Sequence, residues 1–142
     1  MIFVDTSAWL ALADPADAHH NEAREFEATL RKGTHGKLVT SDFVLDETIT
    51  IVRDRAGIAK ARDLSKVLLN SPNVHVLWIG EPQFREALGL LFSREEKNWS
   101  LTDCTSFVLM KGMELETAFT FDSVFRQAGF STLPSSRRKS AD

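Results

Sequence analysis

The sequence has little cysteine, no long apolar run and no excess of positive charge, and each shortage excludes a class of protein. A single cysteine, Cys104, cannot form an internal disulfide or a zinc-ribbon site, and it suits a reducing compartment. No segment approaches the roughly 20 apolar residues that span a bilayer. Residues 1–5 carry an acid within their apolar run and have no basic region, unlike a signal peptide. We therefore expect a cytoplasmic protein with no membrane partner.

The net charge argues against a protein that binds nucleic acid through bulk positive charge. Lys and Arg number 17 against 20 Asp and Glu, which gives a net charge of −3. The basic residues still permit a local basic patch or a contact to phosphate through a metal ion. The sequence also has no Gly-rich phosphate-binding loop. Any binding of nucleic acid is therefore expected to depend on a local site.

The length and composition are those of one globular domain. The chain has 142 residues, of which 43% are hydrophobic and 26% charged. A chain of this size buries roughly two-thirds of its unfolded surface, so it needs no disulfide or structural metal to fold. Its end is polar and basic and has no large apolar side chain. We expect a domain over residues 1–134 and a disordered tail over residues 135–142. A tail that contacts phosphate is the alternative.

Short apolar segments that favour strands alternate with segments that favour helices. The predicted strands are residues 2–4, 37–40, 74–79, 117–121 and 130–133. The predicted helices are residues 7–13, 20–30, 42–55, 59–69, 81–92, 101–113 and 124–128. This alternation predicts an α/β fold with a mainly parallel sheet of about five strands. In such a fold the ligand site lies beyond the carboxyl ends of the strands.

Four acidic residues fall where this fold would bring distant parts of the chain together. Asp5 ends the first predicted strand and Asp122 ends the fourth. Asp103 lies in the first turn of the helix that leads into the fourth strand. Glu47 lies about two turns into the helix that follows the second strand. All four are therefore candidates for a cluster at the carboxyl edge of the sheet.

Glu47 has an acidic neighbour that the helical period separates from it. The helix over residues 42–55 has an apolar face that includes Val44, Thr48 and Val52. Glu47 lies at the border of that face, whereas Asp46 points away from it. We therefore assign the cleft-facing carboxylate to Glu47 and expect Asp46 to be solvated.

Each acid also has a purely structural interpretation. Asp5 can cap the helix that follows it. Residues 100–103 match a capping box, in which Asp103 serves the helix start, and this explains Asp103 at least as well as catalysis does. Glu47 alone fits a surface acid, and Asp122 alone fits a residue that opens a turn. The joint placement of all four acids at one edge favours function.

Four carboxylates in one cleft repel one another, and they stay ionised together only with a cation. Ligation by oxygen atoms and waters suits Mg²⁺ or Mn²⁺ rather than zinc. Such a cluster is suited to metal-assisted hydrolysis of a phosphodiester. A bound metal would also let an acidic protein accept an anionic substrate.

Four motifs, spread from residue 2 to about residue 134, carry a resemblance to one protein family. They are Val-Asp-Thr-Ser-Ala at 4–8, Glu47, Ser-Leu-Thr-Asp-Cys at 100–104, and Thr-Phe-Asp-Ser-Val-Phe-Arg-Gln-Ala-Gly-Phe at 120–130. In this order they resemble the PIN domains. Within that family, a compact single domain looks most like the VapC-type toxins of type II toxin–antitoxin pairs.

This resemblance implies a fold, an activity and a set of site residues. The fold would be a PIN-like α/β/α sandwich, and the activity a Mg²⁺- or Mn²⁺-dependent hydrolysis of RNA by an endoribonuclease. The catalytic and metal-binding residues would be Asp5, Glu47, Asp103 and Asp122, with Asp5 and Asp103 as the main ligands. Hydroxyl groups behind these ligands would come from Thr6, Ser100 and Thr120.

The resemblance also implies partners. They are an RNA substrate, a second copy of the chain in a homodimer, and a VapB-type antitoxin whose C-terminal segment occupies the active-site groove. The alternative function is a catalytically silent PIN-fold module that binds RNA or a partner protein. The presence of an acid at all four positions counts against that alternative.

Three other residues have chemistry that a site could use. Cys104 has no evident base beside it, so we expect a small buried side chain rather than a nucleophile. His19 precedes a predicted helix, and we expect it to be exposed rather than to bind a metal. Trp99 is expected to pack in the core, although a tryptophan beside Asp103 could also stack on a base.

Overall fold

A computed structural model describes residues 1–135 of the chain. Except for Ser135, the tail predicted at residues 135–142 lies outside the described residues. The strands are β1 (Ile2–Val4), β2 (Leu38–Ser41), β3 (Val74–Leu77), β4 (Thr117–Phe119) and β5 (Ser131–Leu133). The helices are α1 (Thr6–Ala13), α2 (His20–Leu30), α3 (Asp42–Ala56), α4 (Ile58–Asn70), α5 (Glu81–Ser93), α6 (Leu101–Gly112) and α7 (Val124–Gln127).

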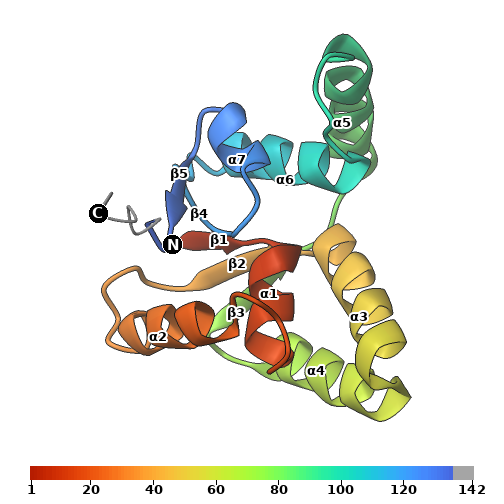
Figure 1. The fold of residues 1–142 in the computed structure, drawn as a ribbon. Coiled ribbons are helices and arrows are strands. Elements are labelled where there is room, and N and C mark those ends of the chain that lie inside the picture. Colours follow the sequence, from red (N-terminus) through yellow and green to blue (C-terminus); the bar gives the residue numbers. More distant parts are fainter. Residues whose placement is uncertain (136–142) are drawn as a thin grey trace, which may run out of the picture.

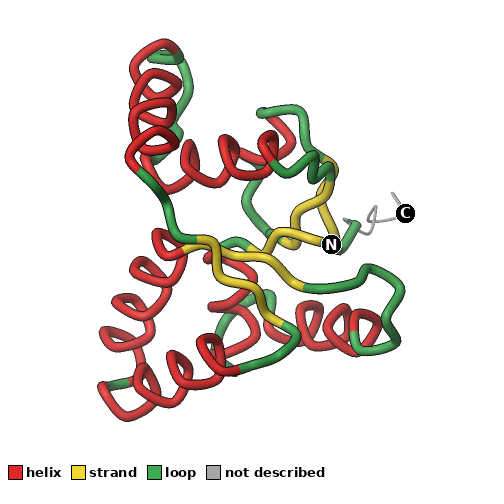
Figure 2. Tube along the Cα trace, turned by 180° about the vertical axis from the view of Figure 1, so that it is seen from behind, coloured by secondary structure: helices red, strands yellow, loops and turns green. Residues whose placement is uncertain are grey.

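The strands form one sheet in the order β3-β2-β1-β4-β5, and every pairing is parallel. Helices cover both faces: α1 to α4 lie on one side of the sheet and α5 to α7 on the other (Figure 1). The view from behind shows the same three layers, with the strands in the middle (Figure 2). The predicted α/β/α sandwich with a mainly parallel sheet of about five strands is therefore confirmed.

The core lies where the central strand meets the helices on both faces. Phe3 and Val4 of β1, Val39 of β2 and Phe119 of β4 are fully buried. This follows from the sequence, because a parallel strand covered on both faces needs a continuous apolar run. The order of the strands puts β1 at the centre of the sheet, so the residue that follows it is also deep in the molecule.

Two strands end earlier than their sequences predict. The apolar runs suggested strands to residues 79 and 121, but β3 ends at Leu77 and β4 at Phe119. In both places a side chain accepts the hydrogen bond of a backbone N–H that a longer strand would use to pair with its neighbour. The Ile79 N–H donates to Asp42 Oδ1 over 2.9 Å, and the Phe121 N–H donates to Ser7 Oγ over 3.0 Å. The chain therefore leaves the sheet where polar side chains from distant segments bind it.

Helix caps fix the starts of the two helices that carry acids of the candidate cluster. Ser41 caps α3, because its Oγ accepts the Val44 N–H over 3.1 Å. Ser100 caps α6 in the same way. The end of α3 is set by Gly57, whose φ of 94° disfavours other residues.

An aromatic cluster holds α6 against α7. The ring of Phe107 packs edge-on against Trp99 and against Phe125, each with a centroid distance of 5.1 Å. Phe107 and Phe125 are almost wholly buried. This packing sets the position of the α6 start relative to the segment after β4. Among residues 1–135, no helix combines the length and the apolar character that crossing a membrane requires.

Candidate active site

Asp5 directly follows the central strand and is almost completely buried, with an exposed fraction of 4%. It is the N-cap of α1, and its Oδ2 accepts the Ser7 N–H at a long distance of 3.5 Å. Asp5 therefore caps α1, as its structural interpretation predicts, but this hydrogen bond is only one of its contacts. Its backbone N–H donates to Phe119 O of β4, which fixes it at the carboxyl edge of the sheet.

Two hydroxyl groups bind one oxygen of Asp5. Thr120 Oγ1 and Ser7 Oγ each donate to Asp5 Oδ2 over 3.0 Å, and the two hydroxyls lie 3.1 Å apart. Thr120 is one of the residues whose hydroxyl group was predicted to lie behind the metal ligands, whereas Ser7 was not singled out as a site residue. Its signal was present in the sequence, because an N-cap side chain faces the residue two positions ahead.

Burial raises the pKa of Asp5 from 3.8 to about 6. Hydrogen bonds from Thr120, Thr6 and Ser7 lower it, whereas repulsion by Asp103 raises it further. The shift means that ionised Asp5 is costly in this position unless a positive charge lies nearby.

Asp103 is partly buried and is bound to the start of α6 by a capping box. The Ser100 N–H donates to Asp103 Oδ2 over 2.9 Å, and the Asp103 N–H donates to Ser100 Oγ over 3.0 Å. Burial raises the pKa of Asp103, the hydrogen bond with the Ser100 backbone opposes this, and repulsion from Asp122 and Glu47 raises it further. Asp103 therefore lies within electrostatic range of all three other acids.

The remaining two acids differ in exposure. Glu47 is half-buried and its neighbour Asp46 is exposed, as the helical period predicted. Asp122 is exposed, and its Oδ1 accepts the Val124 N–H over 3.1 Å, so it also opens the turn before α7. The Asp122 N–H donates to Thr120 Oγ1 over 3.0 Å, which connects this acid to the hydroxyls around Asp5.

The donor set of this cluster fits a hydrated divalent cation. None of the four acids forms an ion pair among residues 1–135. Among the described residues, no group of three or more His, Cys, Asp or Glu side chains is arranged so that it could hold a metal ion by itself. Mg²⁺ needs no such set, because it keeps several waters and binds through one or two carboxylates. The hydroxyl of Thr6, which was predicted to lie behind a metal ligand, is buried and has no hydrogen-bond partner in the described structure.

The capping box predicts the effect of removing one hydroxyl. Replacing Ser100 with Ala is expected to lower the free energy of unfolding by about 1 kcal/mol, because the Asp103 N–H loses its acceptor. Urea unfolding measures this change. Ser93→Ala is the control, since Ser93 is exposed at the end of α5 and should change stability by less than about 0.5 kcal/mol. Equal effects of the two substitutions would show that the cap does not stabilise α6.

The structure confirms the expectations for the other reactive side chains. Cys104 is buried, and burial raises the pKa of its thiol to about 11, which disfavours the thiolate that a nucleophile needs at neutral pH. Trp99 is buried and its Nε1 donates to Gln127 Oε1 over 3.2 Å, which is a packing role. The side chain of His19 is 51% exposed.

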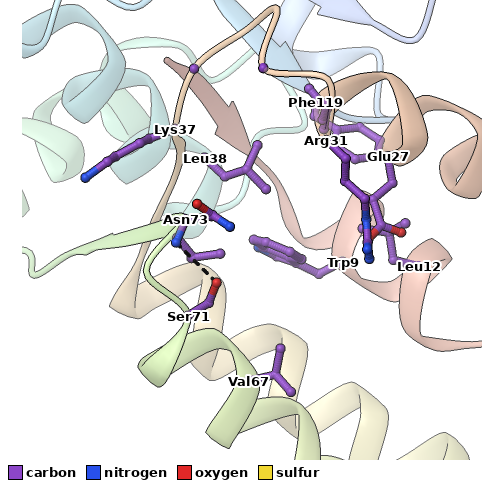
Figure 3. A pocket seen from close by; sticks show the side chains of 14 residues that line it. Trp9, Leu12, Glu27, Arg31, Lys37, Leu38, Val67, Ser71, Asn73 and Phe119 are labelled. Carbon is purple, nitrogen blue, oxygen red and sulfur yellow. Dashed lines mark hydrogen bonds and ion pairs between the residues drawn. The ribbon is translucent and has the colours of Figure 1, made fainter.

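A cavity of about 550 Å³ lies away from the acids, where β2 and β3 begin (Figure 3). Trp9, Leu38 and Phe119 are among the apolar residues that line it, and Lys37 and Asn73 among the polar ones. None of the four acids lines this cavity. The nuclease chemistry predicted from the sequence therefore does not belong to it.

Comparison with known proteins identifies the family. The family model of the PIN domain matches residues 2–131. The chain is 34% identical over 130 residues to the 23S rRNA-specific endonuclease VapC20 of Mycobacterium tuberculosis, covering 92% of this chain and 95% of that protein. It is 24% identical to a VapC ribonuclease of Archaeoglobus fulgidus, covering 86% of this chain and 77% of that protein.

Solved structures agree with this result. The crystal structure of Mycobacterium tuberculosis VapC20, described as a Sarcin-Ricin loop cleaving toxin, matches with a TM-score of 0.85 and 33% identity, covering 92% of this chain and 96% of that one. The FitAcB structure from Neisseria gonorrhoeae matches with a TM-score of 0.65 and 18% identity, covering 93% and 96%, and shows the fold alone. The chain belongs to the PIN domain family, and its resemblance to VapC-type nucleases is confirmed.

Proposed function

We propose that this protein is a divalent-metal-dependent endoribonuclease, the toxin of a toxin–antitoxin pair, and that its four acids form the catalytic site. The observation that carries the proposal is the position of Asp103. Its carboxylate lies within electrostatic range of Asp5, Glu47 and Asp122, which come from three other segments of the chain. A polyanionic substrate can approach such a group of carboxylates only together with a cation.

Asp5 and Asp103 are the proposed main ligands of Mg²⁺ or Mn²⁺, and Glu47 and Asp122 complete the site directly or through waters. When bound, the ion supplies an activated water and stabilises the leaving oxygen of the phosphodiester. The protein orients its own ligands: Thr120 and Ser7 bind one oxygen of Asp5. The Ser100 N–H donates to the Asp103 carboxylate, and the Ser100 hydroxyl accepts the Asp103 backbone N–H. Hydrogen bonds of this kind fix the direction in which a carboxylate presents its free oxygen.

The proposed substrate is a structured loop of large-subunit ribosomal RNA. The VapC20 protein, which shares 34% identity over 92% of this chain, is named as specific for 23S rRNA. Cations near the start of α6 support an RNA substrate. The Lys97 ammonium lies 5.9 Å from the Trp99 ring centroid, and the Arg94 guanidinium lies 5.2 Å from it. Both residues are close in sequence to Asp103; Arg94 is ion-paired with Glu96 over 2.6 Å, so Lys97 is the cation proposed to contact a phosphate backbone.

We further propose a VapB-type antitoxin, a homodimer and a cytoplasmic location. The likeness to VapC proteins supports the antitoxin, because VapC-type toxins pair with antitoxins. An antitoxin that covers the acid cluster would block both the metal and the RNA. Dimerisation is measured by light scattering of the purified chain.

The direct test is the cleavage of ribosomes by the purified chain. With Mg²⁺ or Mn²⁺, we expect one dominant cut in the sarcin–ricin loop, detected by primer extension. The cut should disappear with a chelator and return when excess Mn²⁺ is added. Cleavage of RNA at other sites alone would contradict the proposed substrate. No cleavage of ribosomes or total RNA with either metal would contradict the proposed activity.

A further inference from the structure

His19 and Phe121 form a stacked pair of rings that the proposed chemistry does not use. Their ring centroids lie 4.4 Å apart and their planes differ by 9°. We propose that this pair, the His19–Phe121 platform, stacks on an unpaired base of the RNA and so positions the neighbouring phosphate at the carboxylates. This inference rests on the proposed RNA-cleaving function and adds to it a residue that positions the substrate.

The backbone of Phe121 connects the platform to the acid cluster. Phe121 stands between Thr120, which donates to Asp5, and Asp122. The Phe121 N–H donates over 3.0 Å to Ser7 Oγ, and Ser7 Oγ in turn donates to Asp5. The backbone that carries the ring is thus fixed to the same hydroxyls that bind Asp5.

Packing makes the platform rigid on its inner side. The Phe121 ring packs edge-on against Phe119 at 6.1 Å, and Phe119 packs edge-on against Phe26 at 4.8 Å. The His19 backbone is held as well, because its N–H donates to Asp17 Oδ1 over 2.9 Å. A surface of this kind loses little conformational entropy when a base stacks on it.

The outer face of the platform is open. One face of the His19 ring covers Phe121, 51% of the side chain remains exposed, and its Nδ1 lies 3.9 Å from Glu22 Oε2 at the ring edge. We infer that the exposed part includes the opposite face of the ring. RNA loops present unstacked bases, and proteins bind such bases by stacking aromatic side chains on them. A base on this face would continue the stack of His19 and Phe121 outwards.

A competing explanation is that His19 acts as a cation on a phosphate. The two explanations differ in what can replace the imidazole. Phe keeps a flat ring without charge, whereas Lys keeps a charge without a ring. The substitutions His19→Phe and His19→Lys therefore separate stacking from charge.

The test uses the full-length chain with Mn²⁺ and a synthetic RNA hairpin that carries the sarcin–ricin loop, or total rRNA if the hairpin is not cut. For His19→Ala we expect a KM about tenfold higher and kcat within about twofold of the wild type. His19→Phe should restore KM and His19→Lys should not. His75→Ala is the control, since His75 is exposed on β3 and should leave both constants unchanged.

A second measurement separates base stacking from a structural role of His19. Each loop nucleotide is replaced in turn by an abasic one. If a base stacks on the platform, an abasic nucleotide at one loop position should raise the KM of the wild type. At that position the abasic nucleotide should not raise the KM of His19→Ala above its value with the intact RNA. Three results would overturn the platform. The first is that the abasic nucleotide and His19→Ala raise KM additively at every position. The others are an unchanged KM for His19→Ala, or a KM restored by His19→Lys and not by His19→Phe. If the wild-type chain cuts no RNA, the proposed function fails and the platform fails with it.

Discussion

Replacing Asp103 with Asn is expected to lower the rate of RNA cleavage by more than about a hundredfold, since removing even an outer partner of a metal ligand costs 10- to 100-fold. Asp103 is the acid that interacts electrostatically with all three others. Asn keeps a side-chain oxygen for the Ser100 N–H, so the start of α6 stays intact and the effect reports on charge. Single-turnover cleavage of rRNA at saturating enzyme measures the loss.

The matched control for this prediction is Asp46→Asn. Asp46 is exposed and precedes Glu47 on α3, so its removal changes the net charge equally without touching the cluster. We expect its cleavage rate to stay within about twofold of the wild type. If Asp46→Asn and Asp103→Asn were equally impaired, the loss would reflect overall charge and not a metal site.

Asp5→Asn is expected to stabilise the metal-free protein at pH 8. Burial raises the pKa of Asp5 to about 6 in the folded state, above the value of 3.8 for an unperturbed carboxyl. The folded state therefore holds this proton more tightly than the unfolded chain does. The resulting stability is complete below pH 3.8 and is lost as the pH rises through about 6. At pH 8 the buried charge costs up to about 3 kcal/mol, which Asn removes.

Urea unfolding of the chelated protein between pH 4 and pH 8 measures this prediction. The difference between Asp5→Asn and the wild type should be small at pH 4 and should grow towards pH 8. Added Mn²⁺ should stabilise the wild type more than the variant, because the ion binds only the charged site strongly. A variant that is equally destabilised at every pH would contradict the account of Asp5 as a costly buried charge.

The fold could be predicted from short-range patterns because each strand is an apolar run and each helix has its own boundary signals. The run at residues 2–4 and the caps at Ser41 and Ser100 are examples. The ends of β3 and β4 could not be predicted in this way. They depend on hydrogen bonds that the Ile79 N–H donates to Asp42 and the Phe121 N–H donates to Ser7, which join residues far apart in the sequence.

The four acids of the candidate site are a proposal made from the sequence, whereas the groups around them were found only in the structure. Strand ends and helix starts placed Asp5 and Asp103 at one edge of a parallel sheet. The stacking of His19 on Phe121 depends on side-chain directions that only the folded chain sets. The contact of Ser7 with Asp5 had a local signal, the N-cap position of Asp5, but Ser7 was not singled out from it. The sequence also left function and capping as competing interpretations of Asp103. In the structure the capping box is present, and the same carboxylate lies within electrostatic range of three other acids.

The central claim is that these four carboxylates form one divalent-metal site that cleaves RNA. The most direct measurement is the rate of rRNA cleavage against Mn²⁺ concentration, recorded together with Mn²⁺ binding for the wild type and for Asp103→Asn. We predict that cleavage by the wild type rises in step with bound Mn²⁺, and that the variant loses both strong binding and cleavage. Cleavage that continues at the same rate in excess chelator, or in Asp103→Asn, would contradict the claim.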